Sequence, residues 1–226
     1  MEHEFKFYIE SPFNPLTLRL RRETVLFRLK VMKEVFIKVE NLHREEYETL
    51  VEKDNLEYKT TQDEEGNYND IFLDKIRELD HFFYRNHRVS TTLTLYAMLE
   101  SSMMKICHSK QKEYKSRFSV TDLSDSGIAR CKKYLSILGV VDFSEEPRKS
   151  YWDRISFLGS LRNFFAHAEG DLDSTFYMKS KTINAIKKGD INGLYFEDGN
   201  TLMLTDTFVL SAFDHVEAAL IDLCEN

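Results

Sequence analysis

Residues that end helices and form turns are scarce in this sequence. Its 226 residues include only 8 Gly and 3 Pro. Sandwiches and barrels built from many short strands need a turn every few residues, and glycine and proline supply most of those turns. The composition therefore argues against an all-β fold and favours a string of helices.

Cysteine and long apolar runs are also lacking. Three cysteines, Cys107, Cys131 and Cys224, lie far apart and form no C-x-x-C pair, which argues against a disulfide framework and a zinc knuckle. No run approaches 18 apolar residues, so no transmembrane span is expected. The first residues contain no apolar signal core. We therefore expect a chain that stays in the reducing cytoplasm, without contact with a membrane.

Positive charge is in the minority, since 31 Lys and Arg stand against 38 Asp and Glu and the formal net charge is -7. This balance argues against a general nucleic-acid coat protein. The charge is uneven, however: residues 34–80 hold 15 acidic and 6 basic residues, and residues 105–133 hold 8 basic and 3 acidic ones. A local phosphate-binding surface is compatible with this distribution.

The first half of the chain predicts three helices. Asn14-Pro15 is a typical helix start, because asparagine caps the first turn and proline fits its first position. The helix that begins there should be long and should fray in the acidic stretch after Glu45. A second helix is expected over residues 71–83, and a third from a cap at Ser90 or Thr91. The third is apolar around nearly its whole circumference, which predicts a place at the centre of a bundle.

The second half predicts further helices and one β-hairpin. A short helix is expected over residues 126–138, and a longer one from a cap at Ser150 to a stop near Gly170. Two short apolar segments, 194–197 and 201–204, flank Asp198-Gly199-Asn200, which is a hairpin pattern. Thr205 or Asp206 then caps a last helix.

Together these elements predict an all-α fold. It is a helical bundle with a long N-terminal helix and one small β-hairpin before the last helix. We expect residues 70–226 to form the helical domain, and residues 1–69 to form an N-terminal extension that packs on the bundle or caps it.

The helix over residues 151–167 carries the most informative pattern. At about 100° per residue, one side is apolar and should face the core; its members are Phe157, Leu158, Leu161, Phe164, Phe165 and Ala168. The other side is a polar stripe of Ser156, Gly159, Ser160, Asn163 and His167. It has no long charged side chain, unlike an ordinary solvated face. Two interpretations remain open: a close helix–helix contact lined by hydrogen-bonding groups, or a half-exposed polar face.

The end of this helix carries Arg162 and His167, which can hold a positive charge. Asn163 and His167 are four positions apart and share a face. Arg162 is about 140° and about 7.5 Å away from His167, within reach of a long guanidinium. The simple interpretation is a histidine favoured by the helix dipole and an arginine that extends to solvent.

The string Arg162-Asn163-x-x-x-His167 also matches the R-x(4–6)-H motif, with a polar residue after the arginine, of the HEPN superfamily. The surroundings resemble one branch of that superfamily as well. The similar features are Asp122-Leu123-x(3)-Gly127-Ile128, Lys132-Lys133-Tyr134-Leu135, Trp152-x-x-Ile155, Gly170 and a late Phe-containing helix. The resemblance extends over about residues 90–223.

The resemblance implies a HEPN-like helical bundle that dimerises so that two motifs face each other across a cleft. Many such proteins are metal-independent endoribonucleases that act as toxins or in phage defence. It implies catalytic roles for Arg162, His167 and Asn163, no cofactor, an RNA substrate, and an antitoxin such as a nucleotidyltransferase-type protein as a possible partner. Related proteins often have a polar residue beside the motif, and Glu100 is the candidate here.

The residue types suit that chemistry. The 2′-hydroxyl of RNA can serve as the nucleophile, so that cleavage to a 2′,3′-cyclic phosphate needs no metal. Histidine titrates near neutral pH and can move protons, and arginine stabilises the charge that develops on the phosphate. Glu100 lies in an apolar helix and should meet a cation, with Arg162 as the first choice. The alternative is a partly exposed glutamate.

Further candidates and alternatives complete the expectations. Arg85, Arg88 and Lys105 are basic residues that could follow an RNA backbone, although ordinary helices carry such charges too. The chain could also be a catalytically inactive HEPN domain that binds RNA or protein as a dimer, because membership of a superfamily does not compel activity. A third possibility is a helical dimerisation scaffold with an accidental motif.

Overall fold

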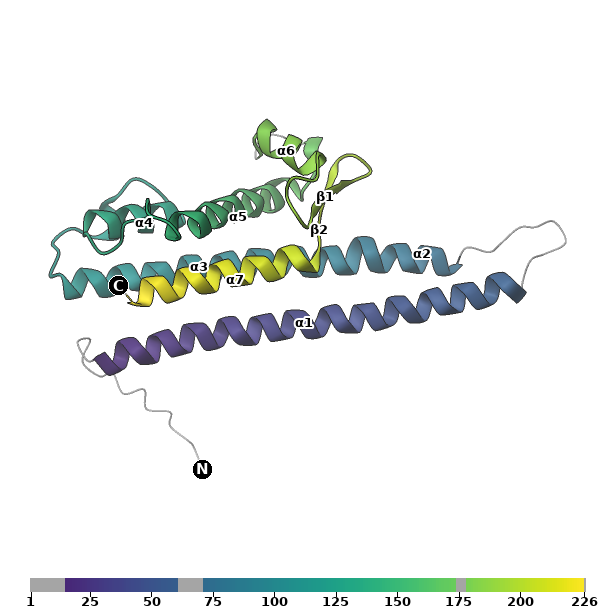
Figure 1. The fold of residues 1–226 in the computed structure, drawn as a ribbon, viewed down its shortest axis with the longest axis horizontal. Coiled ribbons are helices and arrows are strands. Elements are labelled where there is room, and N and C mark those ends of the chain that lie inside the picture. The colour runs from purple at the N-terminus through teal and green to yellow at the C-terminus, as the bar shows by residue number, and fades with distance from the viewer. Residues whose placement is uncertain (1–14, 61–70, 174–177, 226) are drawn as a thin grey trace, which may run out of the picture.

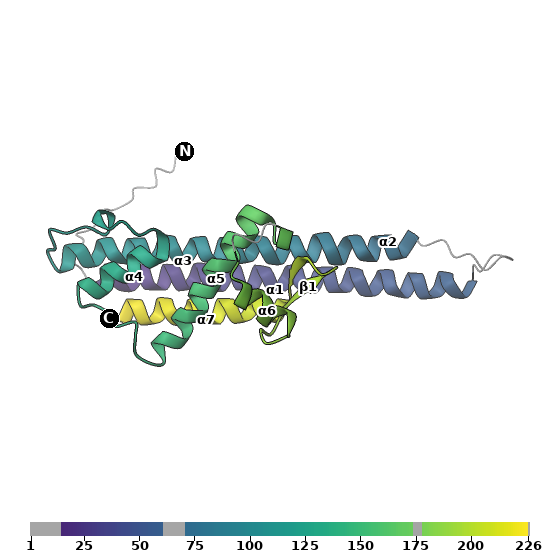
Figure 2. The ribbon, with the colours of Figure 1, turned by 90° about the horizontal axis from the view of Figure 1, so that it is seen from above.

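The computed structural model describes residues 15–60, 71–173 and 178–225, and it shows a helical protein with one hairpin (Figure 1). Its longest element is α1 (Pro15–Thr60). The chain then returns along α1 through α2 (Ile71–Glu78), a π-helical segment (Leu79–Tyr84) and α3 (Arg85–Glu113). Figures 1 and 2 show this second rod lying antiparallel to α1. The predicted all-α class with a long N-terminal helix is confirmed.

Two predicted interruptions of these rods are wrong. The helix does not fray after Glu45 but continues to Thr60, and the polar side chains of Thr49 and Asn55 donate to backbone carbonyls four residues earlier. Ser90 does not cap a helix either, because its hydroxyl donates to the carbonyl of Asn86, 2.6 Å away, within continuous helix. A serine that bonds back in this way is compatible with a helix interior.

The remaining elements lie across one end of these rods. They are a 3₁₀ turn (Val120–Asp122), α4 (Gly127–Ile137), α5 (Arg148–Ala168), α6 (Ser180–Lys187), β1 (Leu194–Glu197), β2 (Thr201–Leu204) and α7 (Asp206–Glu225). Figure 2 shows α5 crossing obliquely over α3 and α7. The short helix α6 was not expected from the sequence. The helix α5 begins before Ser150, so that residue is not its cap.

The hairpin and the start of α7 follow the predicted positions. Strands β1 and β2 pair antiparallel with Leu194 opposite Leu204. The turn between them uses the left-handed conformation at Asp198 (φ 48°) and Gly199 (φ 80°), which these residue types tolerate. Of the two caps proposed for α7, Thr205 is the observed one, because its hydroxyl oxygen accepts from the Phe208 amide at 3.3 Å.

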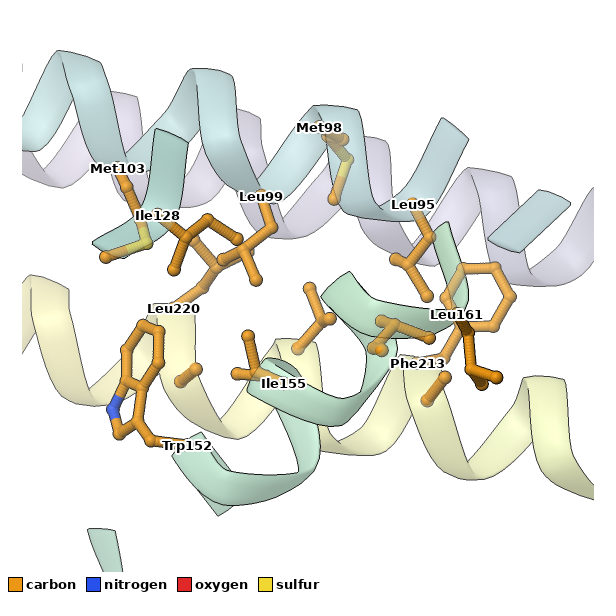
Figure 3. Packing of buried hydrophobic residues seen from close by; sticks show 14 of the residues in the cluster. Leu95, Met98, Leu99, Met103, Ile128, Trp152, Ile155, Leu161, Phe213 and Leu220 are labelled. Carbon is orange, nitrogen blue, oxygen red and sulfur yellow. The ribbon is translucent and has the colours of Figure 1, made fainter. Parts of the chain in front are cut away.

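The core lies between α3, α5 and α7. Figure 3 shows side chains from these helices, among them Leu99, Ile155 and Leu220, directed into the space between them. Helix α1 contributes Leu29 and Phe36 to the same cluster. Helix α1 is therefore part of this core. No helix in the described ranges has the length and apolar character needed to cross a membrane.

A buried polar cluster joins α1 to α3. The Glu40 carboxylate accepts from Arg88 Nε at 3.0 Å and from Nη2 at 2.7 Å. Arg88 Nη1 also donates to the Leu204 carbonyl at 3.1 Å, and its guanidinium lies 4.5 Å from the centre of the Tyr84 ring. The cluster follows directly on the π-helical segment, and π-helical turns inside long helices are rare.

His87 should make the stability of this cluster sensitive to pH. Burial lowers the pKa of His87 from its ordinary value, while the Phe36 carbonyl and Glu40 oppose the shift. The folded state then binds fewer protons than the unfolded state near and below pH 6.5, so the free energy of unfolding should fall as pH decreases through that range. Urea unfolding from pH 7.5 to 5 should show a steeper loss for the wild type than for His87→Phe, which keeps a ring against Phe36. Equal pH slopes would contradict this assignment.

Candidate functional site

Helix α5 places the candidate site on one side of the bundle. Its apolar side is buried as predicted, through Leu158, Leu161, Phe164, Phe165 and Ala168, whereas Phe157 is half-buried. The opposite side carries the polar stripe, in which Ser156, Ser160, Asn163 and His167 are exposed. The helical period therefore predicted the orientation of this helix correctly. These side chains lie on the surface of the bundle.

Gly159 is the member of the polar stripe that meets another helix. A Cβ atom built on Gly159 would lie 2.8 Å from the Tyr96 hydroxyl of α3, closer than real Cβ contacts allow. The glycine thus lets the Tyr96 ring lie against the α5 backbone. Tyr96 is not among the site residues expected from the sequence, although it stands four residues before Glu100 and shares its face.

Arg162 and Asn163 are joined directly. Arg162 Nη1 donates to Asn163 Oδ1 at 2.9 Å, which orients the guanidinium along the exposed side of α5. The Arg162 charge also acts on Tyr96: burial raises the pKa of the Tyr96 hydroxyl, Glu100 raises it further, and Arg162 lowers it. Tyr96 is therefore near both charged groups.

Glu100 has a different neighbour from the expected one. Among the ion pairs of the described residues, none joins Glu100 to Arg162. One carboxylate oxygen lies 3.0 Å from the position that a Cβ atom on Gly127 would take. Gly127 is the first residue of α4, and the N-terminus of a helix carries positive potential. The expected pairing with Arg162 is thus wrong, and Glu100, which is half-buried, lies beside a helix end.

His167 lies in the last turn of α5. The helix ends where Glu169 and Gly170 adopt left-handed conformations, with φ of 50° and 79°. The Glu169 amide donates to the Phe165 carbonyl at 3.1 Å, which closes the helix end. The imidazole is exposed at this end of the helix.

The three candidate RNA-binding residues lie at different places on the bundle. Arg85 donates to the carbonyls of Glu169 and Leu202, so it ties the end of α5 to α3 and β2. Arg88 is held in the ion pair with Glu40. Lys105 is exposed on α3. The contacts of Arg85 and Arg88 give each a structural role.

A second polar region lies elsewhere on α5. A groove of about 770 Å³ runs between the first half of α5, the first half of α7 and residues 190–192. It contains Arg154 and His215, and His215 Nδ1 lies 2.5 Å from the Ser211 carbonyl oxygen. The residues of the motif do not line it. The Ser211-x-x-x-His215 spacing on one helix face is the sequence signal that would have pointed to it.

Comparison with protein-family models, curated proteins and solved structures gives no match to this chain. Within the described ranges, no group of three or more His, Cys, Asp or Glu side chains is arranged to hold a metal ion. A function is therefore inferred from the motif residues of α5 and from their surroundings.

Proposed function

We propose that this chain is an endoribonuclease of HEPN type that cleaves RNA through its 2′-hydroxyl without a metal ion. Arg162, Asn163 and His167 of α5 are the proposed catalytic residues, with Tyr96 and Glu100 as positioning residues. Cleavage of cellular RNA is the activity of a toxin or a phage-defence effector, and we place the chain in that class.

The observation that supports the proposal most directly is the arrangement of Arg162 and Asn163. Their hydrogen bond of 2.9 Å presents a fixed positive charge beside an amide on the exposed side of α5, and the exposed His167 imidazole follows within the next two turns. A guanidinium provides several donors for phosphate oxygens, and an imidazole can remove or return a proton near neutral pH.

The chemistry calls for two copies of the site. One imidazole cannot easily remove the 2′-hydroxyl proton and also protonate the leaving oxygen on the opposite side of the phosphate. Two copies related by a two-fold axis can share these roles. The small exposed side chains of Ser156 and Ser160 would allow a second α5 to approach closely.

The test is an RNA cleavage assay with a chemically defined substrate. Purified protein in excess EDTA should cut a mixed-sequence oligoribonucleotide and leave 2′,3′-cyclic phosphate ends. The same oligonucleotide with 2′-deoxy residues at the mapped cleavage positions should remain intact, because the nucleophile has been removed. Cleavage of the deoxy substrate at the same positions would contradict the mechanism. Binding of RNA without any cleavage would identify the chain as a binding module instead.

A further inference from the structure

Helix α1 exposes several large apolar side chains, interspersed with charged ones, on the side that points away from the bundle. Phe27, Val35, Leu42 and Leu56 have exposed fractions of 65%, 52%, 62% and 64%, and Val31 is exposed at 39%. We call these five residues the outer stripe of α1. The residues that α1 buries, Leu29 and Phe36, lie on the other side of the helix.

Four members of the outer stripe lie on a coiled-coil repeat. Positions 31, 35, 38, 42, 45, 49, 52 and 56 alternate in steps of four and three residues, and Val31, Val35, Leu42 and Leu56 occupy four of them. The other four positions hold Lys38, Glu45, Thr49 and Glu52, and Phe27 lies beside the repeat. Such a repeat places side chains along one line of a helix, where another helix can pack. In Figure 1, α1 forms one edge of the molecule, and α3, α7 and α5 all lie on the same side of α1.

The charge of α1 is polarised along its length. Residues 15–38 contain seven basic residues against the acidic Glu23 and Glu34. Residues 39–60 contain the opposite balance, seven acidic residues against three basic ones, Arg44, Lys53 and Lys59. Two parallel copies of this helix would bring like charges together, whereas two antiparallel copies would place each basic half beside an acidic half.

We infer that the outer stripe of α1 is an interface between two copies of this chain, packed with their α1 helices antiparallel. A helix of 46 residues is about 69 Å long, which is ample for a two-stranded coiled coil. A partner of uniform charge would complement only one half of the helix. A second copy complements both halves at once.

Of the antiparallel registers that the seven-residue repeat allows, the one with the fullest overlap of two α1 helices has Val31 of one copy opposite Leu42 of the other. When Val31 of one copy lies opposite Leu42 of the other, Arg28 lies opposite Glu45 of the other copy. A two-fold interface contains each of these contacts twice. Arg28 and Glu45 are both exposed, and within one chain they are separated by 17 positions, or about 25 Å along the helix. They therefore cannot pair within one molecule.

This interface is independent of the proposed nuclease site. Helix α5 lies on the far side of α3 and α7 from α1 (Figure 1), so pairing through α1 leaves the polar stripe of α5 uncovered. Ser160→Arg should block close approach of two α5 helices and leave α1 unchanged. The two kinds of association can thus be measured separately.

The experiment measures the dissociation constant of the full chain carrying Ser160→Arg by sedimentation equilibrium, before and after charge reversals on α1. The Ser160→Arg chain without a reversal should be a dimer. Arg28→Glu alone and Glu45→Arg alone should each raise the dissociation constant by about tenfold or more, because each places like charges together twice. The double variant should return it to within about threefold of the starting value, because the pair is restored with its signs exchanged.

The matched control is Glu48→Arg, an exposed charge of the same helix outside the outer stripe, which should leave the dissociation constant unchanged. Circular dichroism should show equal helix content in all variants. Three results would each overturn the inference. The Ser160→Arg protein could stay monomeric at 100 µM (a concentration of order 10⁻⁴ M), or the single charge reversals could leave the dissociation constant unchanged. The third such result is a double variant whose dissociation constant does not return toward the starting value. Loss of RNA cleavage in any variant has no bearing on the inference.

Discussion

His167→Ala should lower the rate of RNA cleavage by about 10²–10⁴-fold, the usual contribution of a general acid or base. In a two-fold site the substitution removes both imidazoles, so neither proton transfer retains its group. The side chain is exposed at the end of α5, and its removal should leave the fold unchanged. The measurement is single-turnover cleavage of the oligoribonucleotide, with protein in excess over RNA.

The control for this substitution is His108→Ala. His108 is also an exposed histidine, but it lies near the end of α3 and outside the motif. The His108→Ala variant should cleave RNA at the wild-type rate, and both the His108→Ala and His167→Ala variants should unfold at the wild-type temperature. Full activity in His167→Ala, from a preparation in which an inactive variant such as Arg162→Ala shows no cleavage, would refute the proposed role.

The elements that the sequence predicted well are those with strong local signals. Asp198-Gly199 adopts the positive φ angles that a tight hairpin turn needs, and Gly170 follows the end of α5. The two faces of α5 were correct because the large apolar residues recur with the helical period. These signals act over a few residues, and no distant part of the chain opposes them.

The errors in the fold arose where tertiary packing decides. The acidic part of α1 stays helical to Thr60, since α1 lies alongside α2 and the π-helical segment. Ser90 has the chemistry of a cap but lies inside a rod that packs on α1 and α7, and its hydroxyl bonds to Asn86 instead. The helix and capping preferences of single residues predict helix boundaries poorly where neighbouring helices bury one face of the helix.

The candidate site shows the same division. The placement of Asn163 and His167 on the exposed side of α5 followed from the helical period, which left the direction of the Arg162 side chain open. The proximity of Tyr96 to Gly159 and of Glu100 to the start of α4 depends on how α3, α4 and α5 cross, which no local pattern encodes. Arg88 was grouped with possible RNA ligands because it stands in a basic run, yet its partner Glu40 is 48 positions away.

That buried pair leads to the largest expected effect on stability. Glu40→Ala should lower the free energy of unfolding by about 3–5 kcal/mol, because it leaves the Arg88 guanidinium without its counter-charge at a site where the Glu40 and Arg88 side chains are only 4% and 15% exposed. The Leu204 carbonyl and the Tyr84 ring remain in contact with Arg88, but neither carries a negative charge. Urea unfolding at pH 7 measures the change, provided that the m-value is constant.

The control lies two turns earlier on the same helix. Glu34 is 3.9 Å from Lys30, and their side chains are 54% and 73% exposed, so Glu34→Ala should change the free energy of unfolding by less than about 1 kcal/mol. The double variant Glu40→Leu/Arg88→Met should recover much of the loss of Glu40→Ala, because it removes the buried charge together with its partner. Equal losses for Glu34→Ala and Glu40→Ala would show that Arg88 reaches water once Glu40 is removed, and that the α1–α3 contact does not depend on this pair.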